Sequence, residues 1–223
     1  MSPKFVDKEQ RAKEITLAAL HVFSQKGYSA ASVDQIAVTA GIGKGTVYEY
    51  FPSKDKLYIA SVMAFVEEFE TAMAARLAPV DDPLIRLVSY IGFSVQYCSR
   101  ENSASVRTLF EILQQSMLEG GVFFNRKYLV REMMMGSRRM VTDILLEGVS
   151  KGVFQAHIAR DAEKLATNIL AFLDGASLHN LITENYFNMP EQLAQGMRFL
   201  ASFLLVTPND YDVDELIAQA IGR

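Results

Sequence analysis

The sequence predicts an all-α fold, and three observations support this prediction. Apolar residues recur at helical spacing in almost every segment, as at Ile15, Ala19 and Val22. No run of alternating apolar and polar residues has the length or the β-branched content of a strand. Glycine, proline and asparagine divide the chain into segments of helical length. We therefore expect an N-terminal three-helix domain over residues 1–53 and a larger helical domain over residues 54–223.

The first three predicted helices are bounded by clear start and stop signals. A helix from about Asp7 to Lys26 stops at Gly27, because glycine readily takes the left-handed conformation of a helix end. Ser32 is a good N-cap for a second, very short helix that ends at Gly41. A third helix is expected from about Lys44 to Tyr50. Three short helices therefore come first.

A long fourth helix and about six further helices are expected after these three. Ser53 can cap the fourth helix, which should reach Ala78. Beyond it, turn residues mark breaks at 81–83, 102–103, 120–121, around 152, at 188–190 and at 208–209. No repeat of fixed period and no low-complexity tract is present in the sequence.

The composition fits a protein that folds without covalent or metal crosslinks. Half of the 223 residues are hydrophobic, which is enough for a sizeable core. The single cysteine, Cys98, allows no internal disulfide, and the three histidines lack the spacing of a zinc site. No apolar stretch approaches the roughly 20 residues that span a bilayer. We therefore expect a cytoplasmic protein with no metal, no cofactor and no membrane partner.

The net charge of −4 conceals a mild asymmetry along the chain. Residues 1–56 hold eight Lys and Arg against six Asp and Glu, or +2, and the remainder carries −6. An average over the whole chain can hide a local basic surface. The first quarter of the chain is therefore compatible with a nucleic-acid partner, and the remainder is not expected to contribute.

Residues 32–51 have the pattern of a helix-turn-helix. A short amphipathic helix is followed by a turn with glycine where positive φ is needed, and then by a helix with a polar face. Ile42 is placed to fill the angle between the two helices, while Val47 and Phe51 share an inward face. This arrangement leaves small and polar groups at the outer, N-terminal end of the third helix, which can enter a major groove.

The residues expected to contact DNA have distinct roles. Gly45 permits close backbone approach, and Thr46 offers a hydroxyl and a methyl group to base edges. Side chains at Lys44, Tyr48 and Lys54 can reach phosphates, and Ser32 at the start of the second helix adds backbone N–H groups. Tyr50 lies on the flank, where it contacts DNA or packs against the first helix. The predicted DNA-binding set is Ser32, Lys44, Gly45, Thr46, Tyr48, Tyr50 and Lys54.

These residues form a pattern that resembles the TetR (tetracycline repressor) family. The matching positions are Ile15, Ala18, Ala19, Phe23, Gly27, Tyr28, Ser32, Val33, Ile36, Ala37, the run Ala40–Tyr48, Tyr50, Phe51, Lys54 and Leu57. The resemblance covers about the first 60 residues. It implies that the remaining helices form a ligand-binding and dimerisation domain. Two departures are Gly43, where many relatives have serine or threonine, and the acidic Asp34 on the second helix.

Other classes of protein explain the pattern less well. The spaced glycines at 41, 43 and 45 follow a helix rather than a strand and lack the Gly-Lys-Ser/Thr ending of a phosphate loop. No nucleophile elbow and no metal-ligand spacing suggest an enzyme. The alternative kept open is a small-molecule binding protein whose helix-turn-helix is vestigial or contacts another protein.

The predicted helices after residue 54 are rich in aromatic residues and methionine. Methionine adapts its shape and aromatic walls favour apolar ligands, so these side chains can line a cavity, although each one singly can equally be core. The candidate pocket residues are Phe69, Phe93, Tyr97, Phe110, Met117 and Met134. Six polar groups among them can orient a ligand, and the sequence does not show which of them face inward: Tyr90, Gln96, Tyr97, Arg107, Glu111 and Asn168. The expected effector is a small, mainly apolar molecule.

Two C-terminal helices, over about 161–185 and 191–206, are apolar on more than one side. One side can face the domain's own core, and the other can face the same surface of a second subunit in a two-fold homodimer. The alternative is a central helix buried within a monomer. The candidate interface residues are Leu173, Leu181, Met197, Leu200 and Leu204. Such a dimer would bind a roughly palindromic operator, and the effector would release it.

Overall fold

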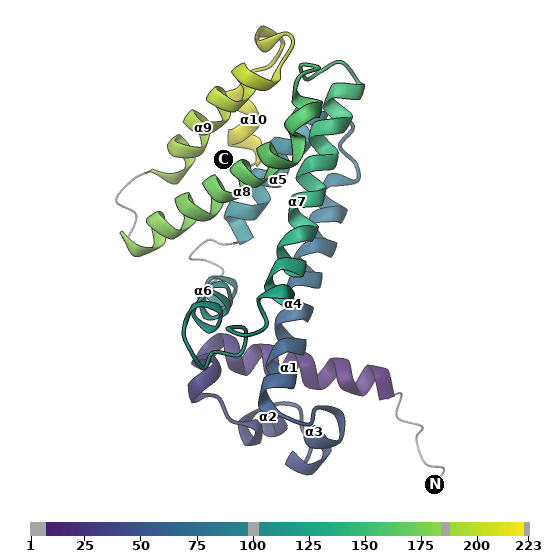
Figure 1. The fold of residues 1–223 in the computed structure, drawn as a ribbon, viewed down its shortest axis with the longest axis vertical. Helices are drawn as coiled ribbons and strands as arrows, with labels where there is room; N and C mark the ends of the chain where they lie inside the picture. Colours follow the sequence, from purple (N-terminus) through teal and green to yellow (C-terminus); the bar gives the residue numbers. More distant parts are fainter. Residues whose placement is uncertain (1–7, 98–102, 184–187, 221–223) are drawn as a thin grey trace. The chain divides into compact units, whose positions relative to one another are not determined.

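A computed structural model describes residues 8–97, 103–183 and 188–220. These residues form ten α-helices, a short 3-10 helix and one isolated antiparallel bridge between Phe154 and Leu205 (Figure 1). The α-helices are α1 (Lys8–Ala30), α2 (Val33–Thr39), α3 (Lys44–Tyr50), α4 (Lys54–Leu77), α5 (Pro83–Tyr97), α6 (Ser103–Met117), α7 (Lys127–Ser150), α8 (Ile158–Ile182), α9 (Met189–Leu204) and α10 (Val213–Ala220). The all-α prediction is confirmed over this part of the chain.

The predicted signals at Ser32, Gly41 and Ser53 are confirmed, but the first helix, predicted to stop at Gly27, continues as α1 to Ala30 across a kink at this glycine. Gly27 (φ 74°) interrupts α1 and Gly41 (φ 66°) ends α2, both in the left-handed region that favours glycine. The hydroxyl of Ser32 accepts a hydrogen bond from the backbone N–H of Gln35, whose side chain in turn accepts from the backbone N–H of Ser32. Ser53 accepts from the N–H of Lys56 at 3.2 Å and so caps α4. Asp7, the predicted first helical residue, lies outside the described residues.

The chain divides into two compact units. The first unit comprises Met1–Phe69 and Ser103–Met133, and the second comprises Glu70–Asn102 and Met134–Arg223. Two helices, α4 and α7, contribute residues to both units. The first unit therefore contains α6 as well as α1 to α3, although α6 lies far away in the sequence. The boundary at residues 53 and 54 remains a prediction.

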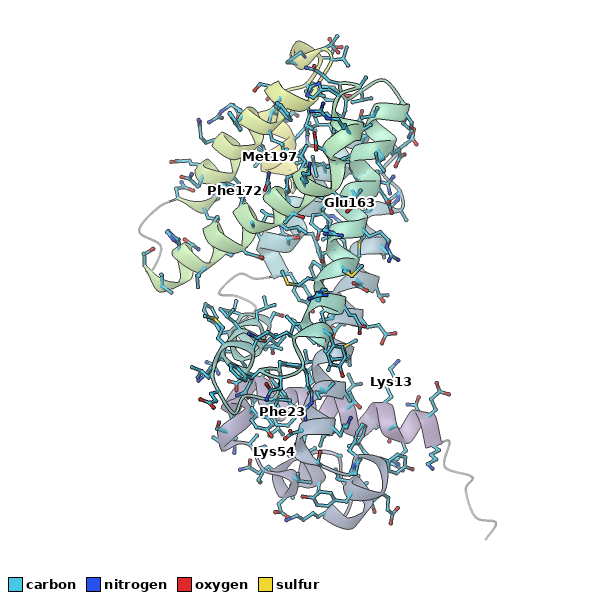
Figure 2. All side chains as sticks on the ribbon, in the orientation of Figure 1. Lys13, Phe23, Lys54, Glu163, Phe172 and Met197 are labelled. Carbon is cyan, nitrogen blue, oxygen red and sulfur yellow. The ribbon has the colours of Figure 1, made fainter. Side chains whose placement is uncertain are left out.

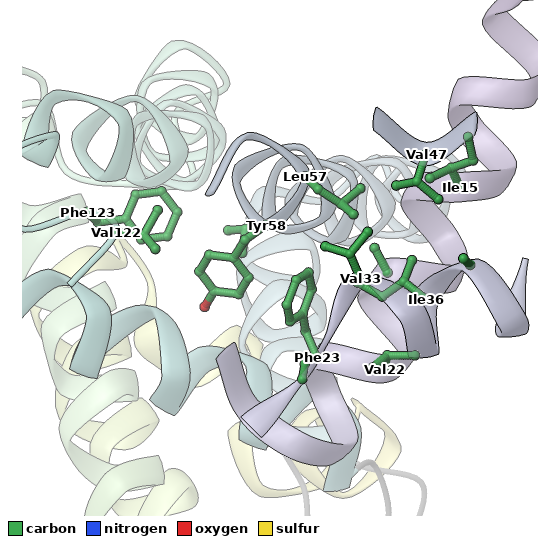
Figure 3. Packing of buried hydrophobic residues seen from close by; sticks show 14 of the residues in the cluster. Ile15, Val22, Phe23, Val33, Ile36, Val47, Leu57, Tyr58, Val122 and Phe123 are labelled. Carbon is green, nitrogen blue, oxygen red and sulfur yellow. The ribbon is translucent and has the colours of Figure 1, made fainter. Parts of the chain in front are cut away.

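The core of the first unit is built by the inner faces of five helices. Ile15, Ile36 and Val47 are almost fully buried, one from each of α1, α2 and α3. Leu57 and Tyr58 bring α4 into the same cluster (Figure 3). Ile42 packs against this cluster as predicted and so fixes the angle between α2 and α3. Burial of this shared face holds the short helices together, since helices of seven residues are not stable alone.

The loop between α6 and α7 completes the same core. Val122 and Phe123 are fully buried, and the ring of Phe123 lies 5.8 Å from that of Tyr58 (Figure 3). The N–H of Val122 donates to the side-chain oxygen of Gln115 at 3.0 Å, which fixes the loop on α6. The predicted break at Gly120–Gly121 is therefore a structural part of the first unit.

The second unit packs α5 against α8 and α10, and α9 against α8 and α10. Close approach depends on glycine: a Cβ atom on Gly92 of α5 would lie 2.8 Å from the backbone oxygen of Ala220. Another at Gly196 of α9 would lie 2.8 Å from the ring of Phe172 on α8 (Figure 2). Asp82 caps α5 by accepting from the N–H groups of Leu84 and Ile85. Within the described residues, none of the helices is long and apolar enough to cross a membrane.

Candidate nucleic-acid interface

The turn between α2 and α3 is a glycine elbow with a buried corner. After Gly41, the N–H of Ile42 donates back to the carbonyl of Ala37 at 3.0 Å. The side chain of Ile42 packs on the core while Gly41 and Gly43 are exposed. The bend is thus fixed from within, and α3 starts with its first turn on the surface.

Small residues line the exposed first turn of α3. Gly43 is the N-cap and offers no side-chain hydrogen bond to the helix. A Cβ atom added at Gly43 or Gly45 would meet nothing within 4 Å. Thr46 is partly exposed and Tyr48 is 43% exposed, whereas Val47 between them is buried. The first turn of α3 therefore presents backbone, a hydroxyl and a phenol to the outside.

Lys44 on this turn is paired with an acidic neighbour. Its Nζ lies 2.7 Å from Oδ2 of Asp34 on α2, and both side chains are exposed. The hydrogen bond and the charge of Asp34 raise the pKa of the Lys44 ammonium. A phosphate would have to compete with this carboxylate for Lys44. The acidic departure noted at Asp34 therefore bears directly on a predicted DNA contact.

Lys54 at the start of α4 lies on an aromatic platform. Its Nζ is 4.4 Å from the ring centroid of Tyr28 and 3.4 Å from the carbonyl oxygen of Ser29. Desolvation lowers the pKa of the ammonium. The Tyr28 hydroxyl donates to the carboxylate of Asp55, and burial followed by this hydrogen bond raises the pKa of the phenol. The cation is held at a defined place beside α2.

Two further predicted DNA contacts, Ser32 and Tyr50, are also engaged within the protein. Ser32 uses both its hydroxyl and its backbone N–H in the capping box with Gln35. Tyr50 is half-buried and packs against the core of the first unit, which was one of the two roles expected for it. Their contacts with DNA stay predictions, as do those of Lys44, Gly45, Thr46, Tyr48 and Lys54.

The sequence did not identify the residues that hold Lys54 in place. Tyr28 and Asp55 come from α1 and α4, and Arg126 from the loop before α7 lies 3.7 Å from Asp55. Glu111 of α6 accepts a hydrogen bond from the backbone N–H of Tyr28 at 3.0 Å. The sequence places Tyr28 in the family pattern and Glu111 among the polar groups that can orient a ligand, but it assigns neither of them a role at Lys54. No sequence signal pairs residues 28 and 111, because their contact depends on how α6 packs on α1.

These features together define a helix-turn-helix DNA-binding unit. The family model described as "Bacterial regulatory proteins, tetR family" matches residues 15–60, which include the whole elbow and α3. This match identifies the N-terminal part of the chain as a DNA-binding domain of the TetR family, and regulators of this family are DNA-binding transcription factors and not enzymes.

Curated relatives support this assignment. The chain is 30% identical over 104 residues to the HTH-type transcriptional activator FasR of Mycolicibacterium smegmatis, a match that covers 47% of each chain. It is 27% identical over 189 residues to the HTH-type transcriptional regulator BetI of Yersinia pestis, which covers 83% of this chain and 87% of BetI. The chain therefore spans about half the length of the first of these relatives.

Solved structures share the fold at low sequence identity. A TetR regulator from Chloroflexus aurantiacus has a TM-score of 0.74 at 18% identity and covers 90% of this chain and 98% of its own. A regulator from Saccharomonospora viridis in complex with choline gives 0.71 at 18% identity, over 89% and 100%. FadR of Bacillus subtilis in complex with stearoyl-CoA gives 0.63 at 22% identity, over 94% and 98%.

The predicted pocket residues are distributed over both units. Phe69, Phe110 and Met117 belong to the first unit, and Phe93, Tyr97 and Met134 belong to the second. Met117 is 67% exposed and Met134 is also well exposed, while Phe110 is half-buried. The rings of Phe93 and Tyr97 lie 5.8 Å apart on α5. Leu109, Leu113 and Met117 form an exposed apolar stripe on α6 at intervals of four residues.

Most of the predicted interface residues are buried in the interior of the second unit. Leu173, Met197 and Leu204 are buried and Leu200 is half-buried, while the side chain of Leu181 lies outside the described set. The exposed apolar residues of α8 and α9 are different ones. They are Phe172, Leu178 and Ile182 on α8 and Phe199 and Phe203 on α9, with Val206 just beyond.

Proposed function

We propose that this protein is a homodimeric repressor that binds a palindromic operator and is released by a small, mainly apolar effector. The observation that supports DNA reading most directly is the first turn of α3. Gly43 and Gly45 leave open space there, and Thr46 and Tyr48 are accessible beside them. A helix with such an end can enter the major groove, whose base edges carry sequence information.

The contacts divide into two kinds. Thr46 offers its hydroxyl and methyl group to base edges, and Gly45 allows the backbone to approach. Lys54, Tyr48 and Lys44 contact phosphates, which adds affinity without sequence preference. Lys54 is better prepared than Lys44, because Tyr28 holds its ammonium and, within the described residues, no carboxylate forms an ion pair with it as Asp34 does with Lys44. Lys44 must first leave Asp34.

The exposed aromatic residues of α8 and α9 support a homodimer. Phe199 is 76% exposed in the single chain, and Phe172, Ile182 and Phe203 add further apolar surface. Exposed aromatic and aliphatic side chains in such number are typical of a protein interface. Pairing of the same surface on two subunits gives a two-fold dimer, which presents two α3 helices to successive major grooves about 34 to 36 Å apart or a multiple of that.

An apolar effector is supported by the stripe of Leu109, Leu113 and Met117 on α6. Of the two named ligands in similar structures, stearoyl-CoA carries a long acyl chain and choline is a small cation. The apolar stripe fits the former chemistry better. Since FasR is named an activator, repression in particular is our proposal.

Release follows from linkage between the two ligands. The effector prefers a conformation in which the two α3 helices no longer match successive grooves, and DNA therefore weakens effector binding by the same factor. Helix α4 is suited to this task because it begins with Lys54 in the first unit and continues into the second.

The test starts from DNA fragments selected from a random pool by the purified protein. Thr46→Ala is expected to change base preference by about 1–3 kcal/mol at the contacted pair. Lys54→Ala should weaken binding to all sequences and reduce the slope of log affinity against log salt by about 1. Equal losses on selected and random DNA for both variants would contradict this division of roles.

Two probes test the effector proposal at fixed salt. Stearoyl-CoA is expected to lower operator affinity, whereas choline at the same concentration leaves it unchanged. Release by choline alone would contradict an apolar effector. A probe that leaves operator affinity unchanged at saturation is not the effector.

A further inference from the structure

The junction between α1 and α2 is held by a carboxylate from α6. The backbone N–H of Tyr28 donates to Oε1 of Glu111 over 3.0 Å, although the two residues are 83 positions apart. Gly27 makes this approach possible, because a Cβ atom there would lie 2.9 Å from Oε2 of Glu111. Any larger residue at position 27 would also be strained at φ 74°.

The carboxylate is itself held in position by α6 and the loop that follows. The side-chain amide of Gln115, one turn further along α6, donates to the same Oε1 at 3.0 Å. Gln115 is buried, and its side-chain oxygen Oε1 accepts a hydrogen bond from the backbone N–H of Val122 at 3.0 Å. Two donors and a buried support therefore restrict where the Glu111 carboxylate can lie.

Tyr28, which the Glu111 carboxylate holds, in turn contacts Lys54. Its ring carries the Lys54 ammonium at 4.4 Å from the centroid, and its hydroxyl donates to Asp55, the next residue of α4. The ring stacks on Phe23 and lies 5.0 Å from Tyr58, so it cannot turn freely. Glu111, Tyr28 and Lys54 thus form a continuous chain of contacts from α6 to the start of α4, all within the first unit.

The core beside this chain contains an unsatisfied polar group. The side chain of Tyr58 is 1% exposed and lies in this core (Figure 3), and its hydroxyl has no hydrogen-bond partner among the residues that the structure describes. Burying a hydroxyl without a hydrogen-bond partner is unfavourable, and this lowers the cost of rearranging the core around Tyr58. Desolvation, and after it the charge of Glu111, raises the pKa of this phenol.

We propose that Glu111 is a positioning residue for DNA binding: through Tyr28 it sets the place of the Lys54 ammonium against the operator phosphate. This role rests on the proposed function, in which Lys54 contacts a phosphate. It also gives α6 a direct means to change DNA affinity. An effector that moves α6 at Phe110 or Met117 would withdraw the Glu111 carboxylate and release Tyr28 with Lys54.

A double-mutant cycle on the 223-residue chain tests the proposal. The variants are Glu111→Ala, Lys54→Ala and the double variant, titrated with selected operator and random DNA at several salt concentrations. Glu111→Ala is expected to weaken binding to both DNAs roughly tenfold and to reduce the salt slope by about 1. The double variant should bind no more weakly than Lys54→Ala, because one contact is lost in each case.

Two conservative variants distinguish the effect of side-chain length at position 111 from the effect of its charge. They also test the proposal if Glu111→Ala fails to fold. Glu111→Gln keeps a side-chain oxygen within reach of the Tyr28 N–H and should bind like the wild type. Glu111→Asp keeps the charge but shortens the side chain by one methylene, and should lose affinity. The reverse order would show a general charge effect and would overturn the positioning role.

Glu119, an exposed carboxylate just beyond α6, provides the matched control. Its replacement by alanine should leave the salt slope unchanged. The proposal is overturned if Glu111→Ala has the same DNA affinity and salt slope as Glu119→Ala. It is also overturned if the double variant loses as much binding free energy as the two single variants together. Thr46→Ala in the same assay reports on the proposed function: a loss there without one at Glu111 overturns only the positioning role, and a wild type that selects no sequence overturns both.

Discussion

The exposed turn of α3 and the exposed faces of α8 and α9 are both surfaces without a partner in the single chain, and they differ in chemistry. The first turn of α3 is made of glycine, lysine and threonine, with open space at Gly43 and Gly45. The α8 and α9 faces carry phenylalanine and isoleucine. A polar, slim surface suits a hydrated and charged partner, whereas an apolar surface suits a second copy of itself. This difference supports our proposal that DNA binds the first surface and a second subunit binds the other.

The largest expected effect comes from removing the apolar surface. Replacement of Phe199 and Phe203 by serine should dissociate the dimer, because buried aromatic anchors contribute about 2 kcal/mol or more each at an interface. Operator affinity should fall with it, since each monomer holds a single α3. Analytical ultracentrifugation measures the dissociation constant. Leu17→Ser, at an exposed position on α1, is the control and should leave the dimer intact.

Gly45→Ala makes the comparison sharper because its two effects have opposite signs. Alanine should stabilise α3 by about 0.5–1 kcal/mol, since glycine inside a helix is unfavourable and the added methyl meets no protein atom. Operator affinity should nevertheless fall roughly tenfold if the backbone approaches a base pair or phosphate at this point. Thermal unfolding and DNA titration measure the two quantities. A stabilised variant with unchanged affinity would place the DNA elsewhere.

Asp34→Asn tests whether the acidic side chain competes with DNA for Lys44. Loss of the ion pair frees the ammonium, so affinity for operator and random DNA should rise about threefold with a steeper salt dependence. Glu49→Gln on α3 is the matched change in charge. If both variants raise affinity equally, a general charge effect and not release of Lys44 is responsible.

The smallest effect is expected at the N-cap of α3. Gly43 provides no side-chain hydrogen bond there, so Gly43→Ser should stabilise the first unit by a few tenths of a kcal/mol. The change in melting temperature measures it. A loss of stability would mean that the added side chain does not take the capping position, despite the open space around Gly43.

Local signals explain why the elbow could be predicted from the sequence. Ser32 and Ser53 are caps, Gly41 is a stop and Gly27 is a kink, and each acts within one helical turn. The bounds of α3 follow from Gly43 before it and Pro52 after it. Long-range packing had no such signal. The contact of Glu111 with Tyr28, like the insertion of Val122 and Phe123 into the first core, depends on tertiary structure.

The apolar helices near the C-terminus show the same limit. Their composition indicates two apolar sides but does not show which side faces the core. Leucine and methionine at 173, 197 and 204 are buried, while phenylalanine at 199 and 203 remains exposed. The choice between sides is made by packing of α8 and α9 on α5 and α10.

The most direct test of DNA reading by a dimer is a footprint on the selected operator at single-base resolution. Two equivalent protected segments, related by two-fold symmetry and centred about 10 base pairs or a multiple of a helical turn apart, are the predicted result. Thr46→Ala should alter the sequence selected in both segments alike. A single asymmetric protected segment would contradict reading by two α3 helices. So would Thr46→Ala selecting the same sequence as the wild type.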